Sequence, residues 1–547
     1  MRPGVRAVGV RRLAVLACGV AIVVGLVASG SERTGASAWA QAPQKPNLIV
    51  ITTDDQSLDD WSAQIMPRTF ARLEQGGTFV PQAIAVPPLC CPARASLLTG
   101  SYPHNHGVKE NVYAWLRGKA NTLPVWLRRA GYRTAFFGKF LNGYHRFAGV
   151  RPAPGFDHWW GVVGNFDRYY EYAVSENGYV RGFGPRSEDY LTTQINQRAV
   201  EWIEARAGGD KPFFAWISHF APHATSVEEH LDPACPTGGS PAIKPGDLDE
   251  TPGGGPPLRD RPVPHEHPAY NEADVSDKPR FVRELPPLSE AAQERIERRA
   301  RCRWAALQEV DRGVEEVFAA LERTGQLERT VVVLFSDNGV MNGEHRITGG
   351  KAVPYDGALR IPFALWVPEQ VLGEAPPPSL EGLVGTIDVA PTLLELARTR
   401  PCNSRKCRRL DGVSLVDALR GEGTLSGRRL FIEIGKGCPR FRTVRTGRYH
   451  YTEWMRKPGS GLRRCTPAER ELYDLREDPG MLENLLADAG YWDHSRFARL
   501  ADRLSRCSGI RGRDPRLRVP KRAKARKGKG RSKRTKRVKR VRVPFCG

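Results

Sequence analysis

The C-terminal end of the chain contains almost no acidic residues. Residues 511–547 hold 18 Lys or Arg but a single acidic residue, Asp514, and so carry +17 of the chain's formal net charge of +23. Aromatic residues are absent from Lys521–Arg542, the most basic part of this tail. Without aromatic rings to stack on bases, specific recognition of nucleic acid is not supported, and any such contact would involve backbone charge alone.

Internal repeats are also absent, and the composition argues against a helical bundle. Gly (55) and Pro (43) are abundant among the 547 residues, which is typical of a loop-rich protein. A chain of this length exceeds one small hydrophobic core, so two or three structural units are expected.

The N-terminus has the features of an export signal. Four arginines between positions 2 and 12 precede an apolar run, Leu13–Ala28, and Ala38–Ala40 fits an A-x-A cleavage site. This pattern predicts a signal peptide over residues 1–40 and a secreted protein. The alternative is an uncleaved N-terminal membrane anchor, since the run is close to spanning length, which would leave the protein at the cell surface.

An exported basic tail has a restricted choice of partners. Outside the cell the abundant polyanions are acidic glycans, anionic lipid surfaces and cell-wall polymers. We therefore hypothesise that residues 511–547 bind a polyanion, the alternative being a solvated tail with no specific partner. Because the tail lacks apolar periodicity, we expect it to be disordered.

Cysteine is plentiful for an exported chain, with 11 residues against only 5 methionines. Cys18 lies in the predicted signal peptide. If Cys90 is a catalytic residue, nine cysteines remain, and eight of these could form disulfides. These nine are Cys91, Cys235, Cys302, Cys402, Cys407, Cys438, Cys465, Cys507 and Cys546. Cys402 with Cys407 is the most local pair; the other pairings stay open, as does the alternative that several are free and buried.

Residues 41–400 alternate short apolar runs with helical patterns, which predicts an α/β fold with a largely parallel sheet. The runs that read as buried strands are Asn47–Thr53, Tyr132–Gly138, Pro212–Ser218 and Thr330–Ser336. Leu288–Thr324 has apolar residues at helical spacing and is followed by Gly325, so it predicts a long helix.

The rest of the chain divides into an insertion and a smaller unit. Cys235–Pro287 is rich in Pro, Gly and charge, and predicts an irregular functional or mobile insertion. Residues 401–510 are expected to form a C-terminal α+β subdomain. Its predicted elements are strands at Leu430–Ile434 and Tyr449–Trp454 and a helix at Ser495–Leu504.

Each of the four predicted strands runs into side chains suited to anion or metal chemistry. These are, in order, Asp54 and Asp55, Lys139, His219 and His223, and Asp337 and Asn338. Because ligands bind at the carboxyl ends of parallel strands, we expect one composite site. The carboxylates and amide offer oxygen ligands, which favour Ca²⁺ or Mg²⁺ over zinc. The alternative for each acidic pair is a solvated turn or a helix cap.

Cys90 lies where an anion would be favoured. Pro92 suits the first turn of a helix and Gly100 its end, so Cys90 is expected just before a helix N-terminus. Arg94 would point to the same place and could clamp an oxyanion. The alternatives are a buried thiol or a disulfide between Cys90 and Cys91.

Cys90-Cys91-Pro92-Ala93-Arg94, followed by Leu98-Thr99-Gly100, resembles the C-x-P-x-R…TG signature of the type I sulfatases, which belong to the alkaline phosphatase superfamily. The resemblance extends from about Lys45 to Leu485, although Ala93 stands where the family usually has Ser. Two segments resemble the branch of N-acetylglucosamine-6-sulfatases and extracellular heparan sulfatases. They are Tyr102–Gly107 and Gly138–Asn142.

The resemblance implies an alkaline-phosphatase-like sandwich, with a mixed, mostly parallel sheet between helices. It implies that a formylglycine-generating enzyme oxidises Cys90 to an aldehyde, whose hydrate attacks sulfur and later expels sulfate. The implied activity is hydrolysis of a sulfate ester of a sugar, glycan or aryl alcohol.

The resemblance also implies a role for each site residue. Asp54, Asp55, Asp337 and Asn338 would hold Ca²⁺, or alternatively Mg²⁺, together with the modified Cys90. Arg94 would stabilise the hydrated aldehyde, Lys139 and Lys351 would bind sulfate oxygens, and His223 would contact sulfate or protonate the leaving alcohol. His219 is expected to pack at its strand end, and His104, His106 and His345 to be structural.

Two other functions remain open from the sequence. Related sites use the same aldehyde on phosphoryl groups, so a phosphodiesterase or phosphonate monoester hydrolase is one alternative. The other is not an enzyme but a polyanion-binding surface protein with an inactive site.

Overall fold

The structure is a computed structural model of the whole chain. It describes residues 44–546 except 165–167, 226–256 apart from 235, 243 and 249, 261–262, 264–266, 457–464, 488–493, 512–517 and 521–539. The predicted signal peptide lies outside the described residues, as do 24 of the 53 residues of the predicted insertion, Cys235–Pro287. No helix of the described part is long and apolar enough to cross a membrane.

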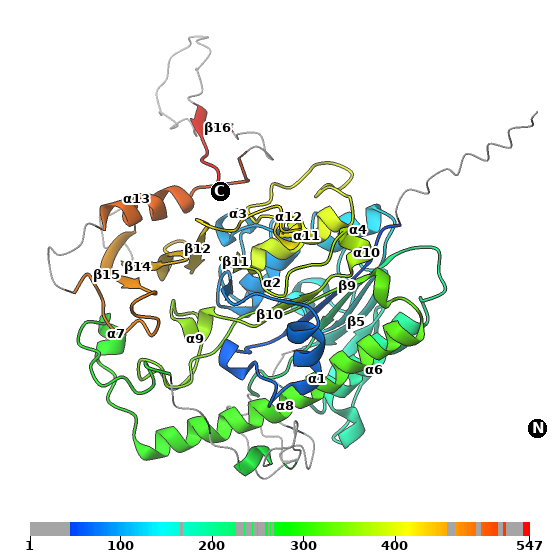
Figure 1. The fold of residues 1–547 in the computed structure, drawn as a ribbon, viewed down its shortest axis with the longest axis horizontal. Helices are drawn as coiled ribbons and strands as arrows, with labels where there is room; N and C mark the ends of the chain where they lie inside the picture. Colours follow the sequence, from blue (N-terminus) through cyan, green and yellow to red (C-terminus); the bar gives the residue numbers. More distant parts are fainter. Residues whose placement is uncertain are drawn as a thin grey trace, which may run out of the picture. The chain divides into compact units, whose positions relative to one another are not determined.

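A nine-stranded mixed sheet organises the larger part of the chain (Figure 1). Its order is β2-β10-β9-β1-β8-β4-β5-β6-β7, and the five strands from β9 to β5 are parallel. The strands are β1 (Asn47–Thr53), β2 (Thr78–Phe79), β4 (Arg133–Gly138), β5 (His158–Val163), β6 (Ala173–Glu176), β7 (Tyr179–Gly182), β8 (Phe213–Ser218), β9 (Thr330–Ser336) and β10 (Phe363–Trp366). All four predicted strands are central strands of this sheet, which confirms the α/β prediction.

The central strands are buried on both faces, as their continuous apolar runs require. In β1, Leu48 and Val50 pack in one core, and Ile49 and Ile51 pack in the other. The helices that contribute to the first core are α2 (Cys90–Thr99), α4 (Leu123–Arg129), α5 (Tyr144–Ala148), α10 (Glu369–Leu372), α11 (Val389–Leu396) and α12 (Val416–Leu419). Those of the second are α6 (Leu191–Glu204) and α8 (Glu290–Arg323). The sheet is therefore sandwiched between helices, as expected.

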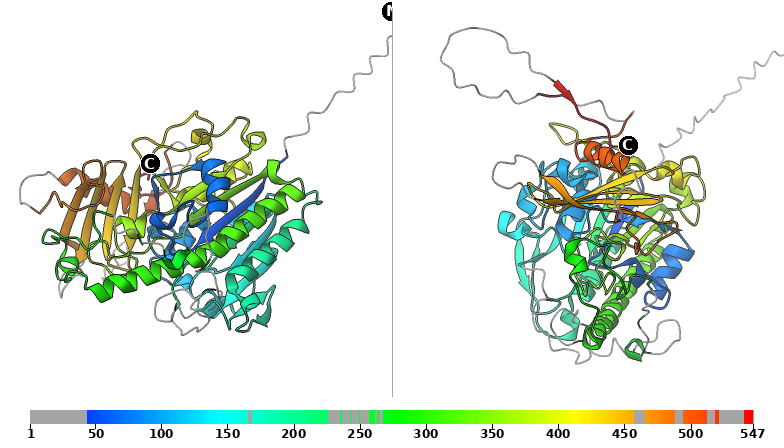
Figure 2. Two further views of the ribbon diagram at one scale, coloured as in Figure 1. Left: turned by 60° about the horizontal axis from the view of Figure 1, so that its bottom comes forward. Right: turned by 90° about the vertical axis from the view of Figure 1, so that its left-hand side faces the viewer.

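Helix α8 is the long helix that the sequence predicts, and it runs beside α6 across one face of the sheet (Figure 2). It begins after Ser289, whose side chain accepts a hydrogen bond from the N–H of Ala292. Gly325 follows the helix with φ +65°, a conformation that favours glycine and ends the helix. Shorter helices outside these layers are α1 (Pro67–Phe70), α3 (Pro103–His106), α7 (Arg280–Arg283) and α9 (Asp356–Leu359).

A second, antiparallel sheet has the order β12-β13-β14-β15 and is followed by α13 (Ser495–Leu504). Its strands are β12 (Arg429–Ile434), β13 (Phe441–Thr446), β14 (Tyr449–Arg456) and β15 (Thr466–Asp474). Apolar residues of this sheet and of α13 share one core with Ile84, Val86 and Tyr102. Lys45–Gly547 accordingly forms one compact unit, in which the antiparallel sheet packs against residues of the larger part of the chain.

Four disulfides join eight of the nine cysteines that the sequence left for pairing. They are Cys235–Cys302, Cys402–Cys407, Cys438–Cys465 and Cys507–Cys546. Cys90 and Cys91 are free and buried, so of the two alternatives the structure has buried thiols and no disulfide between them. The local pair that the sequence suggested, Cys402–Cys407, is confirmed.

The prediction of a disordered tail is wrong at the two ends of the tail. Strand β16 (Arg518–Pro520) pairs with β17 (Arg540–Arg542), and Cys546 is bonded to Cys507, beside α13. Apolar periodicity could not reveal this arrangement, because a disulfide and a two-stranded pairing hold these residues, not an amphipathic pattern. The residues between β16 and β17 lie outside the described residues.

Candidate active site

The carboxyl ends of β1, β4, β8 and β9 meet at one edge of the large sheet, as the sequence predicted. Backbone hydrogen bonds continue past the strand ends: Asp337 N donates to Thr53 O (3.1 Å), and Lys139 N donates to Ser218 O (2.9 Å). These bonds fix the first residue after each strand. The side chains that follow the strands are therefore held together at one place.

Arg94 of α2 is the centre of the buried hydrogen-bond network. Its guanidinium is inaccessible to solvent and donates to Asp337 Oδ2 (2.7 Å) and Asp54 Oδ2 (3.0 Å). It also donates to Ser218 Oγ (2.5 Å) and to the carbonyl of Lys139 (2.7 Å). Burial opposes the charge, but the two carboxylates outweigh it and raise the pKa of Arg94. Arg94 thus positions residues from four strand ends.

Cys90 is the first residue of α2, one position further into the helix than expected. Its Sγ lies 3.5 Å from Asp54 Oδ1 and 2.9 Å from Lys351 Nζ. Burial and the charge of Asp54 raise the pKa of the thiol to about 12, so the unmodified side chain is a neutral thiol near pH 7. The helix ends at Gly100, which has φ +57°. The contact of Cys90 with Asp54 shows that the N-terminus of the helix, its positive end, lies beside the carboxylates.

The carboxylates form a cluster that suits a cation. One ligand atom from each of Asp54, Asp55, Cys90 and His223 lies within 4.8 Å of the others. Asn338 Nδ2 donates to Asp55 Oδ1 (2.6 Å), whereas Asn338 Oδ1 is buried without a hydrogen-bond partner. A buried carbonyl oxygen without a donor is costly, and a hard cation would satisfy it.

Asp337 and Asp55 differ in their surroundings. Asp337 accepts hydrogen bonds from Arg94 and from the backbone N–H of Asp55 (3.3 Å), while burial and the charge of Asp54 raise its pKa to about 6. Asp55 has φ +67°, a strained conformation for a residue with a side chain. Burial acts against ionisation of Asp55, but Lys351 and His223 outweigh it and lower the pKa.

Two lysines neutralise the carboxylates. Lys139 forms an ion pair with Asp54, and Lys351 forms one with Asp55. The side chains of Lys351 and His223 are 15% and 24% exposed, whereas that of Lys139 is 1% exposed. The site therefore opens to solvent between Lys351 and His223.

His223 has one ring nitrogen fixed and one available. Nδ1 lies 2.6 Å from the carbonyl of Ala224, an acceptor, so Nδ1 carries a proton and Nε2 is the atom that gains or loses one. Nε2 lies 3.5 Å from Asp55 Oδ2. Burial and the two nearby lysines lower the pKa of His223 to about 4.

The other histidines that the sequence offered as candidates lie outside the cluster. His219 is buried outside the cluster, and His106 Nε2 bonds Ser96 Oγ (3.1 Å). His104 bonds Glu433 (2.8 Å), and His345 bonds Glu272 (2.6 Å).

Sequence reasoning missed Ser218, whose Oγ accepts from Arg94 and donates to the carbonyl of Lys139 (2.6 Å). It is the last residue of β8, and its place at a strand end was a usable signal. It also missed Arg303 of α8, which donates to the carbonyl of Asp55 (2.5 Å) across 248 residues of sequence. No local pattern marks that contact.

Comparison with known proteins gives consistent results. Residues 46–399 match the sulfatase family. An extracellular sulfatase homologue from Caenorhabditis elegans is 30% identical over 383 residues, covering 68% of this chain and 48% of its own length. The chain thus spans about half of that relative. The human N-acetylglucosamine-6-sulfatase is 29% identical, covering 71% of this chain and 67% of its own length.

A solved structure shares the fold. It is described as a complex with its substrate D-glucosamine-2-N,6-O-disulfate, and it superposes with a TM-score of 0.61 over 84% of this chain and 97% of its own, at 21% identity. The sandwiched, mostly parallel sheet with a smaller antiparallel sheet is the alkaline-phosphatase-like fold of sulfatases, which confirms the expected fold. From the extent of the family match and from this fold, we conclude that the chain belongs to the sulfatase family.

Proposed function

We propose that the protein hydrolyses sulfate monoesters of sugars, with Cys90 oxidised to formylglycine as its nucleophile. The observation that carries the proposal is the position of the Cys90 side chain. It is buried within the cluster of Asp54, Asp55 and His223, and its Sγ lies 2.9 Å from the ammonium of Lys351. The net reaction consumes water and releases an alcohol and sulfate.

The donor set fits a resident divalent cation, Ca²⁺ or Mg²⁺. Asp54, Asp55, Asp337 and Asn338 would hold it, and the unpartnered Asn338 Oδ1 supports this assignment. The cation would supply positive charge against the sulfate oxygens. The maturation enzyme would supply the aldehyde, whose hydrate carries the two hydroxyl groups that the reaction needs.

The protein's own residues have separate tasks in this proposal. Lys351 and Lys139 bind sulfate oxygens and stabilise the charge that develops on them. Arg94 holds the carboxylates of Asp54 and Asp337 in position through its hydrogen bonds to them. His223 presents Nε2 to the sulfate or to the leaving alcohol oxygen, because Nδ1 is committed to Ala224. With a pKa of about 4, Nε2 must first take up a proton before it can give one to the alcohol.

The substrate class and location are part of the proposal. The names of the N-acetylglucosamine-6-sulfatase relative and of the disulfated glucosamine complex support a sulfated amino sugar. The four disulfides support action in an oxidising compartment outside the cell, as does the extracellular relative.

The test compares the protein with its Cys90→Ala variant, both made with a formylglycine-generating enzyme. We expect the peptide that spans Cys90 to have the mass of the aldehyde, and the protein to hydrolyse 4-nitrophenyl sulfate and N-acetylglucosamine 6-sulfate. Cys91→Ala, at the neighbouring thiol, is the matched control and should keep activity.

Two outcomes would contradict the proposal. One is an aldehyde at residue 90 with no turnover of any sulfate ester. The other is faster turnover of a phosphate diester or phosphonate monoester than of the sulfate esters by the same preparation, which would favour the phosphoryl alternative.

A further inference from the structure

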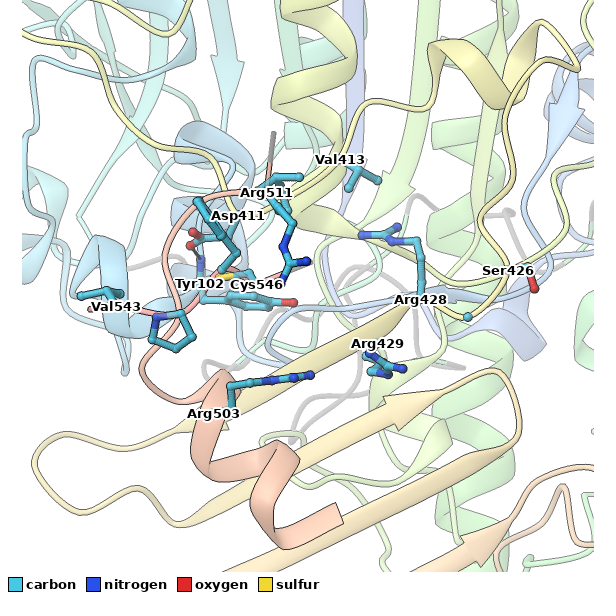
Figure 3. A pocket seen from close by; sticks show the side chains of 14 residues that line it. Tyr102, Asp411, Val413, Ser426, Arg428, Arg429, Arg503, Arg511, Val543 and Cys546 are labelled. Carbon is cyan, nitrogen blue, oxygen red and sulfur yellow. Dashed lines mark hydrogen bonds between the residues drawn. The ribbon is translucent and has the colours of Figure 1, made fainter. Parts of the chain in front are cut away.

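A pocket of about 700 Å³ lies between the C-terminal sheet, α13 and the last residues of the chain (Figure 3). Four arginines surround it: Arg428 and Arg429 at the start of β12, Arg503 on α13, and Arg511. We call it the arginine pocket. The pocket is lined by Tyr102, which lies just beyond the C-terminal end of α2, whereas Cys90 is the first residue of that helix. A helix of ten residues is about 15 Å long, so the pocket is separate from the catalytic cluster.

Three of these arginines carry uncompensated charge. Arg428 forms a bidentate ion pair with Asp388 (2.6 and 2.9 Å). Arg429, Arg503 and Arg511 are exposed, and within the described part of the chain no carboxylate pairs with them. Like charges gathered around one cavity repel each other unless an anion lies between them.

Several arginines of the neighbouring sheet do have carboxylate partners. On the same small sheet and its connections, Arg442 is paired with Glu453, Arg445 with Asp356, and Arg448 with Asp474. Asp411, the acidic residue that lines the pocket, already accepts hydrogen bonds from the N–H groups of Tyr102 (2.8 Å) and Gly509 (2.7 Å). It also accepts from Asn105 Nδ2 (2.8 Å), so both of its carboxylate oxygens already have donors.

The pocket also offers a neutral donor and an apolar wall. The hydroxyl of Tyr102 accepts a hydrogen bond from Phe431 N (3.3 Å), so its own hydrogen can be donated. Pro544 and Phe545 form the apolar side, and the Cys507–Cys546 disulfide fastens them there. Guanidinium groups facing an apolar wall suit an anionic group carried on an organic ring better than a free inorganic ion.

We propose that the arginine pocket binds a sulfate group of a sulfated glycan, as a second site distinct from the catalytic cluster. The choice of a sulfated sugar as ligand rests on the proposed function. The basic sequence between Arg511 and Val543, with 17 Lys or Arg, begins and ends at residues that line the pocket. Its charge raises the local concentration of polyanions at the pocket.

The experiment measures binding of a heparin hexasaccharide by the full chain at 0.15 M salt. The test variant replaces Arg429, Arg503 and Arg511 by Ser. The control variant replaces Arg295, Arg298 and Arg476 by Ser as well. These arginines are also exposed, and they lie outside the pocket. We expect the test variant to bind about tenfold more weakly and the control to change less than about twofold. Both should hydrolyse 4-nitrophenyl sulfate like the parent protein.

A second variant distinguishes binding by the pocket from binding by the basic sequence beside it. Residues 521–539 are replaced by Asn-Gly, which suits a two-residue hairpin and keeps β16, β17 and Cys546. In this shortened variant, we expect replacement of the three arginines to weaken hexasaccharide binding by the same factor, about tenfold. Loss of that dependence would overturn the proposal, because binding would then belong to the basic sequence.

Three further results would also overturn it: unchanged binding by the test variant, an equal loss in the control, or equally tight binding of inorganic polyphosphate. The proposed function fails separately. If the parent protein bound the hexasaccharide through the three arginines but hydrolysed no sulfate ester, the pocket would stand and the catalytic proposal would fall.

Discussion

Lys351 Nζ lies 2.9 Å from Cys90 Sγ, although 261 residues separate the two in sequence. The same ammonium forms an ion pair with Asp55. Burial disfavours the charge on Lys351, but the negative charge of Asp55, together with that of Asp54, outweighs this effect and raises the pKa of Lys351. Lys351 therefore stays protonated and presents a fixed positive charge to whatever binds at Cys90.

Lys351→Ala should lower kcat/KM for a sulfate ester by about 10²- to 10³-fold, because a positive charge aimed at the sulfate oxygens is lost. Steady-state kinetics on 4-nitrophenyl sulfate measure the effect. Lys406→Ala, at an exposed lysine, is the control. A loss of less than about threefold would remove Lys351 from the catalytic proposal.

Arg94→Gln should lower the free energy of unfolding by about 3–5 kcal/mol, because it leaves Asp54 and Asp337 buried without their partner. Arg94→Lys keeps the charge but loses the forked donor geometry of the guanidinium. Its free energy of unfolding should therefore lie between those of the parent protein and Arg94→Gln. Denaturant unfolding measures both, and Arg295→Gln on the exposed side of α8 should change stability by less than about 0.5 kcal/mol. Equal stability of Arg94→Gln and the parent would contradict the assigned network.

Removal of divalent cations should lower stability as well as activity. A cation present at 100 times its Kd stabilises the folded protein by about 2.7 kcal/mol, which EDTA would remove. Thermal unfolding with and without EDTA, followed by Ca²⁺ or Mg²⁺, measures this. Asn338→Ala should reduce the shift, since it removes the unpartnered oxygen. An identical melting temperature in EDTA and in excess Ca²⁺ would contradict the cation site.

The pair of His104 and Glu433 should give a pH-dependent contribution to stability. Burial works against both charges, but their mutual contact, at 2.8 Å, raises the pKa of His104 above 6.5 and lowers that of Glu433 to about 2. The stabilisation from Glu433 is present above pH 4.5 and lost as pH falls through about 2. The stabilisation from His104 is present below pH 6.5 and lost as pH rises through its raised pKa.

Glu433→Gln should therefore cost most between about pH 4.5 and 6.5, on the order of 2 kcal/mol. Unfolding free energies of the parent and variant from pH 3 to 9 measure it. Glu328→Gln, at an exposed residue, should show no such window. A difference that does not vary with pH would show that His104 is not charged in the folded protein.

The central strands and their polar ends could be predicted because both signals are local. Asn47–Thr53 and Thr330–Ser336 are continuous apolar runs followed at once by acidic residues, and parallel pairing brings such ends together. The long helix α8 could be predicted for the same reason, because its apolar spacing and the glycine that ends it, Gly325, lie within one segment.

Contacts between distant segments could not be predicted in this way. Arg94 was expected to clamp an oxyanion. Only the tertiary structure reveals that its donors face Asp54 and Asp337, the carbonyl that follows β4 and the hydroxyl of the last residue of β8. Likewise, Arg429, Arg503 and Arg511 belong to separate elements, and nothing in sequence marks them as neighbours.

The Cys507–Cys546 disulfide makes the end of the chain resistant to simple loss by proteolysis. A trypsin-like protease that cut after any Lys or Arg between residues 521 and 539 would break the backbone once. The fragment that carries Cys546 would stay covalently attached through Cys507. A nicked protein would therefore keep its full mass until a reducing agent divided it, and Pro544 and Phe545 would remain beside the arginines that they help to enclose.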